Sequence, residues 1–304
     1  MSKRWSICHR LTTAAAALAA LLLPTSAFAE SVLFVGNSFT FGASSPVWKY
    51  RAESVSDLNK GGVGGVPALF KTFAEQAGLD YSVSLETVGG TDLEFHLTQK
   101  AQLIDRRWDH VILQSYSTVD KNRPGDPRGL IRSVDKLAGM FRARNPRAAI
   151  WLMATWSRAD QTYLTSGHWY GKPIGAMAKD VRSAYDEAAA ASSLITGVIP
   201  VGEAWNRAFD AGIADPDPYD GLARGQVNLW AHDNYHASAF GYYLEALVVF
   251  GQLTGRDPRS LGPQETAGYE LGFSPEQMTE LQKIAFDEIA AQAAKAMPKR
   301  NERR

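Results

Sequence analysis

Short apolar runs of strand length alternate with stretches of helical periodicity along most of the chain, and this alternation limits the possible folds more than any other feature. The apolar runs are residues 32–35, 81–88, 111–113, 149–154 and 198–201. Apolar residues recur at helical spacing over residues 67–77, 91–105, 130–144 and 177–191. Such alternation is typical of βαβ units, whose parallel sheet is covered on both faces. We therefore expect a three-layer α/β/α sandwich with a mainly parallel, flavodoxin-like central sheet.

The first 29 residues have the pattern of a secretory signal peptide. Lys3, Arg4 and Arg10 form a positive start, an apolar run covers residues 11–23, and Ala-Phe-Ala at 27–29 matches a cleavage site. The apolar run is short for a membrane span, although an N-terminal anchor is the alternative interpretation. We expect a secreted or periplasmic protein whose mature chain begins at Glu30 and has no stable membrane insertion.

The remaining chain is predicted to form one large domain over residues 30–273, long enough to bury a sizeable core. A helix and a basic tail follow it over residues 274–304. Within the domain, residues 42–66 contain SSP and KGGVGGVP and are expected to form a mobile surface insertion. Residues 157–176 and 210–229 are rich in Gly, Pro, Asp and Tyr, which is typical of long functional loops.

Charge and cysteine content exclude several classes of function. The chain has 32 Lys and Arg and 32 Asp and Glu; residues 1–29 hold three of the basic residues and none of the acidic ones, so the mature chain has a formal charge of −3. Such a balance gives no indication of nucleic-acid binding. Cys8 is the only cysteine, so the mature chain offers no disulfide, thiolate metal site or cysteine nucleophile.

Ser38 comes directly after the first predicted strand, in VLFVGNSFTFG. In open α/β sheets, ligands bind beyond the carboxyl ends of the strands, so a serine there faces the binding crevice. It could act as a nucleophile, or Asn37 and Ser38 could simply cap a turn. Neither G-x-S-x-G nor a phosphate-binding P-loop is present.

A serine nucleophile needs a base and a group that orients the base. Asp233 and His236 are the best candidates, because they lie three residues apart just before a predicted helix. They could also be a helix-start acid and a partly buried polar residue. A third interpretation is a metal site for a metal-dependent hydrolase, formed by His232, Asp233 and His236.

Three segments resemble the ordered sequence blocks of the SGNH hydrolase superfamily, the GDSL-like serine esterases. GNSFT at 36–40 resembles the first block, in the branch that reads GNS(F/Y)T; ETVGGTDLEFHL at 86–97 resembles the second; DNYHASAFGYYL at 233–244 is similar to the last, D-x-x-H. The resemblance spans residues 32–250 and implies a serine esterase or acyl hydrolase that needs no cofactor.

By this resemblance, Ser38 is the nucleophile, His236 the general base and Asp233 its orienting partner. The backbone N–H groups of Ser38 and Gly90 would bind the oxyanion, with Gly89 as the neighbouring possibility for the second donor. Asn37 would lie in the pocket beside them.

One block departs from the family pattern, because G-x-N-D is absent and VILQSYS occupies its place at 111–117. Gln114 is the nearest residue and its amide offers similar N–H donors, so we predict it as the third oxyanion donor. The alternative is a buried amide that bridges loops, which would leave two donors.

His96 and Trp156 are possible pocket residues, although each could instead belong to the core. We expect a small ester or acylated glycan as substrate, with O-acyl groups on carbohydrate as the leading class. The competing hypothesis is a non-catalytic secreted carbohydrate-binding protein on an SGNH-like scaffold.

Overall fold

A computed structural model describes residues 29–296, and the predicted signal peptide lies outside them except for Ala29. Six strands form one sheet: β1 Glu30–Gly36, β2 Ser56–Asp57, β3 Tyr81–Thr87, β4 His110–Leu113, β5 Ala149–Ala154 and β6 Gly197–Pro200. Their order is β2-β3-β1-β4-β5-β6, and every pair is parallel. Each of the five predicted strands is present, and the predicted α/β sandwich is confirmed.

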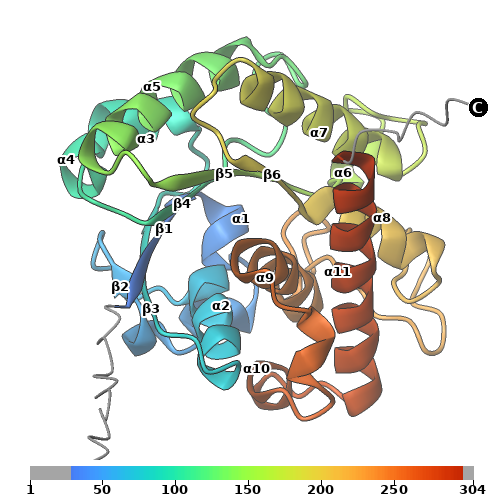
Figure 1. Ribbon diagram of the computed structural model, residues 1–304. Coiled ribbons are helices and arrows are strands. Elements are labelled where there is room, and N and C mark those ends of the chain that lie inside the picture. Colours follow the sequence, from blue (N-terminus) through green and yellow to red (C-terminus); the bar gives the residue numbers. More distant parts are fainter. Residues whose placement is uncertain (1–28, 297–304) are drawn as a thin grey trace, which may run out of the picture.

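Helices cover both faces of this sheet (Figure 1). One layer contains α3 Leu93–Gln99, α4 Ala101–Ile104, α5 Arg128–Arg144 and α7 Gly175–Ala190. The other contains α2 Gly65–Gln76, α8 Val201–Asp210, α9 Ala239–Thr254, α10 Thr266–Glu270 and α11 Pro275–Ala296. Short helices α1 Ser38–Phe41 and α6 Ala159–Tyr163, with 3₁₀ turns at Pro46–Lys49, Ala52–Ser54 and Pro258–Leu261, complete the described elements. No helix among residues 29–296 is long and apolar enough to span a bilayer.

The alternating side chains of β1 explain why its sequence is apolar without interruption. Val32 and Phe34 belong to one hydrophobic cluster, and Leu33 and Val35 belong to the other. A strand that is buried on both faces needs apolar residues at successive positions. The first cluster is completed by α2, α8, α9 and α11, and the second by α3, α5 and α7.

Two segments differ from the expectation. The predicted helix over 91–105 is divided at Lys100, whose backbone leaves helical geometry at φ −125° and ψ 1°. Residues 42–66, expected as a mobile surface insertion, instead contain two 3₁₀ turns and β2, which extends the sheet beside β3.

The strand order makes the end of β1 a topological switch point. Strand β1 pairs with β3 on one side and with β4 on the other, so the connections after β1 and β3 leave in opposite directions. Ligands bind at such switch points in open α/β sheets. Ser38 follows β1 at this point.

Candidate active site

Ser38 is the first residue of α1, in a tight turn that follows β1. Asn37 caps the helix, because its side chain accepts a hydrogen bond from Phe39 N at 3.1 Å. A Cβ on Gly36 would lie 2.7 Å from Gln114 Oε1, so glycine is required there. Ser38 is 7% exposed and follows the carboxyl end of β1. The turn-capping interpretation of Asn37 therefore describes the structure, and it is compatible with a nucleophilic Ser38.

The side chains of Asp233 and His236 face each other in the loop before α9. His236 Nδ1 lies 2.7 Å from Asp233 Oδ2, and the His236 backbone N–H donates to Asp233 Oδ1 at 2.9 Å. Burial raises the pKa of Asp233, but hydrogen bonds from the His236 ring, from backbone N–H groups and from Ser44 outweigh it and hold the pKa at about 2. Asp233 is thus an anion at neutral pH and favours the Nδ1–H tautomer of His236, which leaves Nε2 as the basic nitrogen.

The loop of Asp233 and His236 packs against the segment that carries Ser38. The His236 ring lies 5.6 Å from the Phe39 ring between centroids, and Tyr242 Oη donates to the Ser38 carbonyl at 3.0 Å. Within residues 29–296, no hydrogen bond joins Ser38 Oγ to His236. Such bonds are often long or misaligned before substrate binds.

Two residues that the sequence did not single out hold this loop. Ser44 Oγ donates to Asp233 Oδ2 at 2.8 Å and lies 3.5 Å from His236 Nδ1. The Tyr235 ring lies 4.0 Å from the His236 ring between centroids. The Arg158 guanidinium stacks on the Tyr235 ring, 3.8 Å from its centroid. Tyr235 belongs to the D-x-x-H block, which is a signal that could have identified it. The only sequence signal for Ser44 is its position shortly after the GNSFT segment.

Three backbone N–H groups, in the turns after β1 and β3, are the candidates for the predicted oxyanion site. Those of Ser38, Gly89 and Gly90 make no hydrogen bond to any described residue. Gly90 has φ +71°, a left-handed conformation that favours glycine, and a Cβ there would meet no atom within 4 Å. A Cβ on Gly89 would lie 3.6 Å from the Phe41 ring. The open side of Gly90 is consistent with a place for substrate.

Gln114 is fully buried and both ends of its amide are used. Oε1 accepts from Asn37 N at 2.9 Å and from Thr40 Oγ1 at 3.1 Å, and Nε2 donates to the Ser115 carbonyl. These contacts join the end of β4 to the turn after β1. They favour the bridging role that the sequence left open over the role of a third oxyanion donor.

The predicted pocket residues His96 and Trp156 are fully buried. Trp156 stacks between Phe39 at 4.4 Å and Trp205 at 4.6 Å, and Phe39 is the residue after Ser38. His96 is held between Glu86 and Thr91. Both residues therefore support the site from within the core, and their side chains do not form its surface.

The described residues form no ligand set of the kind that the metal-dependent interpretation requires. His232 is exposed, and the described residues contain no group of three or more His, Cys, Asp or Glu side chains suited to a metal. The close pair is Asp233 and His236.

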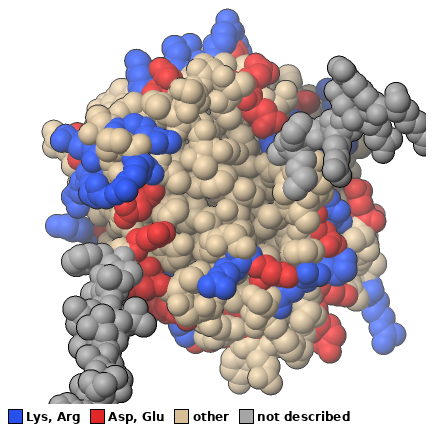
Figure 2. All heavy atoms as spheres, in the orientation of Figure 1, with Lys and Arg blue, Asp and Glu red and all other residues tan. Residues whose placement is uncertain are grey.

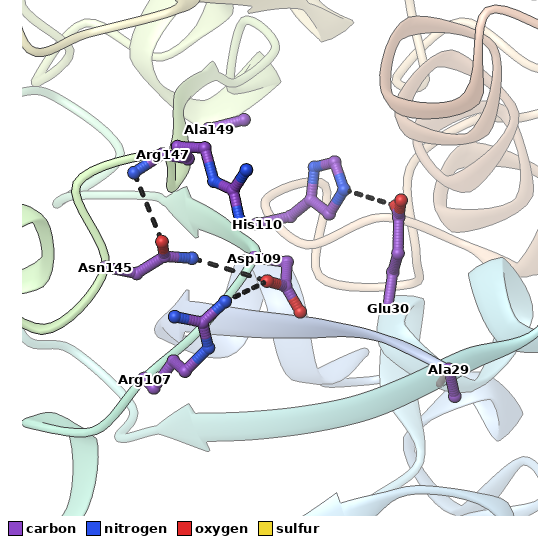
Figure 3. A pocket seen from close by; sticks show the side chains of 8 residues that line it. All are labelled: Ala29, Glu30, Arg107, Asp109, His110, Asn145, Arg147 and Ala149. Carbon is purple, nitrogen blue, oxygen red and sulfur yellow. Dashed lines mark hydrogen bonds and ion pairs between the residues drawn. The ribbon is translucent and has the colours of Figure 1, made fainter. Parts of the chain in front are cut away.

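A cavity of about 580 Å³ lies at the opposite edge of the sheet, where β1, β4 and β5 begin (Figure 3). Figure 3 shows His110 paired with Glu30, at 2.8 Å, and Asp109 in contact with Asn145 and Arg107. Ser38 follows the other end of β1, so this cavity is separate from the candidate active site.

Charged side chains of both signs are interspersed around the face of the molecule seen in Figure 2, and the centre of that face is largely uncharged.

Comparison with known proteins gives matches at the level of structure. No family model matches the chain, and no curated protein is similar enough in sequence to count as a match. A DUF4886 family protein from Bacteroides uniformis has a TM-score of 0.62 and 20% identity, over 87% of this chain and 96% of its own. A protein from Parabacteroides merdae described as a GDSL-like lipase has a TM-score of 0.51 and 16% identity, over 74% of this chain and 95% of its own. Together with the parallel sheet, these matches show that the chain has the α/β fold of the SGNH, or GDSL-like, hydrolases.

Proposed function

We propose that this protein is a secreted serine hydrolase that cleaves carboxylic esters through Ser38, His236 and Asp233. The observation that carries the proposal is the Asp233–His236 pair, which the fold brings against the Ser38 turn from nearly 200 residues away. The shared fold with a GDSL-like lipase supports the same chemistry. Export rests on the signal-peptide pattern of residues 1–29.

The reaction would begin with attack of Ser38 Oγ on the ester carbonyl while His236 Nε2 takes the hydroxyl proton. Asp233 stabilises the imidazolium through Nδ1. The N–H groups of Ser38 and Gly90 bind the oxyanion of the tetrahedral intermediate. Collapse of the intermediate breaks the ester C–O bond, and the alcohol leaves with the proton from Nε2. Water, activated by His236, then hydrolyses the acyl-enzyme and frees Ser38.

The Tyr163 and Tyr219 pair supports acylated carbohydrate as the substrate class. Their rings lie 6.0 Å apart, in segments that follow β5 and α8, and Tyr219 is 45% exposed. An exposed aromatic ring offers a stacking surface for a sugar. Deacetylation of an acetylated polysaccharide by wild type and by Tyr219→Ala tests this point, because loss of stacking should raise KM for the polymer and leave a small ester unaffected.

The nucleophile is tested with a fluorophosphonate probe and a short-chain nitrophenyl ester. We expect the wild type to be labelled and to hydrolyse the ester, and Ser38→Ala to lose both properties. Ser82→Ala is the matched control, because Ser82 is exposed on β3. Hydrolysis by Ser38→Ala at the wild-type rate would show that Ser38 is not the nucleophile.

A second candidate is carbohydrate binding without catalysis. It is favoured by the absence of a Ser38–His236 hydrogen bond in the described structure and by the missing G-x-N-D block. It predicts glycan binding with no labelling of Ser38.

A chelator that abolishes hydrolysis while the probe has no effect would instead support the metal-dependent alternative.

A further inference from the structure

A buried row of polar side chains leads to the turn that carries Gly89 and Gly90. Glu86 on β3 and His96 on α3 are both 0% exposed. His96 Nδ1 contacts Glu86 Oε2, and His96 Nε2 lies 3.0 Å from Thr91 Oγ1. These three residues have no role in the proposed reaction itself.

The direction of each hydrogen bond follows from the number of protons available. Thr91 has one hydroxyl proton, which it donates to the Val88 carbonyl at 2.7 Å. His96 Nε2 must therefore be the donor to Thr91 Oγ1. On the other side of the ring, a proton lies between Nδ1 and the Glu86 carboxyl group. The imidazole is consequently fixed in orientation, with its Nε2–H directed at Thr91 Oγ1.

These bonds close the turn over residues 88–91 and leave its glycine N–H groups free. The Thr91 hydroxyl joins the two ends of the turn, and Asn37 Nδ2 donates to the Thr91 carbonyl at 2.9 Å. Val88 N donates to the Gly36 carbonyl at 3.0 Å. Two successive glycines have wide conformational freedom, so a turn that contains them needs such external restraint to present an N–H in one direction.

The far end of the row reaches the protein surface. Glu86 Oε1 accepts from Asn59 Nδ2 at 2.8 Å, and Asn59 Oδ1 accepts from Lys100 Nζ at 2.8 Å. A buried acid–histidine pair is costly to desolvate and is often less stabilising than apolar residues of the same volume. A contribution to site geometry would account for its presence here.

We propose that Glu86, His96 and Thr91 are positioning residues that hold the Gly89–Gly90 turn ready to donate to the oxyanion. The proposal rests on the proposed ester hydrolysis. None of the three touches the substrate: Thr91 acts through the turn, His96 through Thr91, and Glu86 through His96.

The sharpest test compares Thr91→Val with Thr91→Ser, because valine keeps the shape and loses the hydroxyl while serine keeps the hydroxyl. A displacement of about 1 Å in a catalytic group can cost about 10²-fold in rate. We expect Thr91→Val to lower kcat for a nitrophenyl ester about 10-fold to about 100-fold with KM near the wild-type value, and to lower Tm because the buried His96 Nε2–H loses its acceptor. Thr91→Ser should restore kcat. Thr91→Ala serves if the valine variant does not fold.

Wild-type kcat in Thr91→Val, or equal losses in the valine and serine variants, would overturn the proposal. If the wild type shows no Ser38-dependent hydrolysis, the proposed function fails, and NMR of histidine labelled with ¹⁵N still tests the hydrogen-bonded row. We expect a proton on His96 Nε2 at neutral pH, identified by its changed resonance in Thr91→Val. An Nε2 without a proton would contradict the proposed hydrogen bonds of Glu86, His96 and Thr91, whatever the activity.

Discussion

Ser44 Oγ donates a hydrogen bond to Asp233 Oδ2 at 2.8 Å and thereby joins two segments that are 189 residues apart. Ser44 has φ +60°, an unusual conformation for serine. The bond links the segment just after α1 to the loop that carries His236. It restrains Asp233 from the side of the proposed nucleophile.

Loss of the Ser44 hydroxyl should therefore impair hydrolysis. A hydrogen bond to a charged group contributes about 1.5–3 kcal/mol, so we expect Ser44→Ala to lower kcat/KM by about 10-fold to about 100-fold. Ser45→Ala is the control, because Ser45 only caps the next 3₁₀ turn. Ester hydrolysis by the two purified variants provides the measurement, and equal rates would contradict the role of Ser44.

The two glycines after β3 should respond differently to alanine. Gly90→Ala puts a Cβ in the left-handed region, which costs about 1–2 kcal/mol, and shifts the N–H of the turn. We expect a lower free energy of unfolding and a fall in kcat of about 10-fold or more. Gly89→Ala places its Cβ in ordinary contact with Phe41 and should be tolerated. Urea unfolding and ester kinetics distinguish them; greater damage in Gly89→Ala would transfer the donor role to Gly89.

Gln114→Ala separates a bridging amide from an oxyanion donor. The substitution leaves the buried Asn37 N–H without its acceptor, which should lower the free energy of unfolding by about 1–3 kcal/mol. Gln99→Ala, at an exposed position of α3, is the control. An unchanged urea midpoint together with a fall in kcat of about 10²-fold or more would restore the donor role predicted from the sequence.

Glu245 on α9 should make the protein less stable as pH rises. Its side chain is fully buried and neither oxygen has a hydrogen-bond partner among the described residues. Burial raises the pKa of this carboxyl well above the ordinary value of 4.5. The folded state therefore retains a proton that the unfolded chain releases, and stability falls as pH rises through and above 4.5 until the folded pKa is reached.

We expect Glu245→Gln to raise Tm at neutral pH and to have little effect at acidic pH, because the amide resembles the protonated acid and cannot ionise. Each pH unit in that window corresponds to about 1.4 kcal/mol. Thermal unfolding across pH provides the measurement, with Glu280→Gln on the exposed side of α11 as the control. A Tm gain that does not depend on pH would exclude ionisation as the cause.

Most of the fold could be predicted because its signals are local. The uninterrupted apolar run of β1 and the periodicity of α5 each indicate one kind of element. β2 was missed because two residues, Ser56 and Asp57, carry no pattern; they become a strand only through their pairing with β3.

The candidate site was predictable only where a block resembles a family. Asp233 and His236 are close in sequence, and the structure places them in contact. The bond from Ser44 to Asp233 depends on the packing of two distant loops, which no local pattern encodes. The contacts of Gln114 likewise depend on which neighbour its amide meets in the folded core.

The side-chain amide of Asn37 donates to the Thr91 carbonyl after β3 and to the Ser115 carbonyl after β4. Both bonds can form only once these strands have docked on either side of β1. The geometry of the Ser38 turn therefore depends on both neighbouring strands, and a chain in which either strand is undocked lacks these two restraints. The proposed activity is thereby tied to completion of the native strand order.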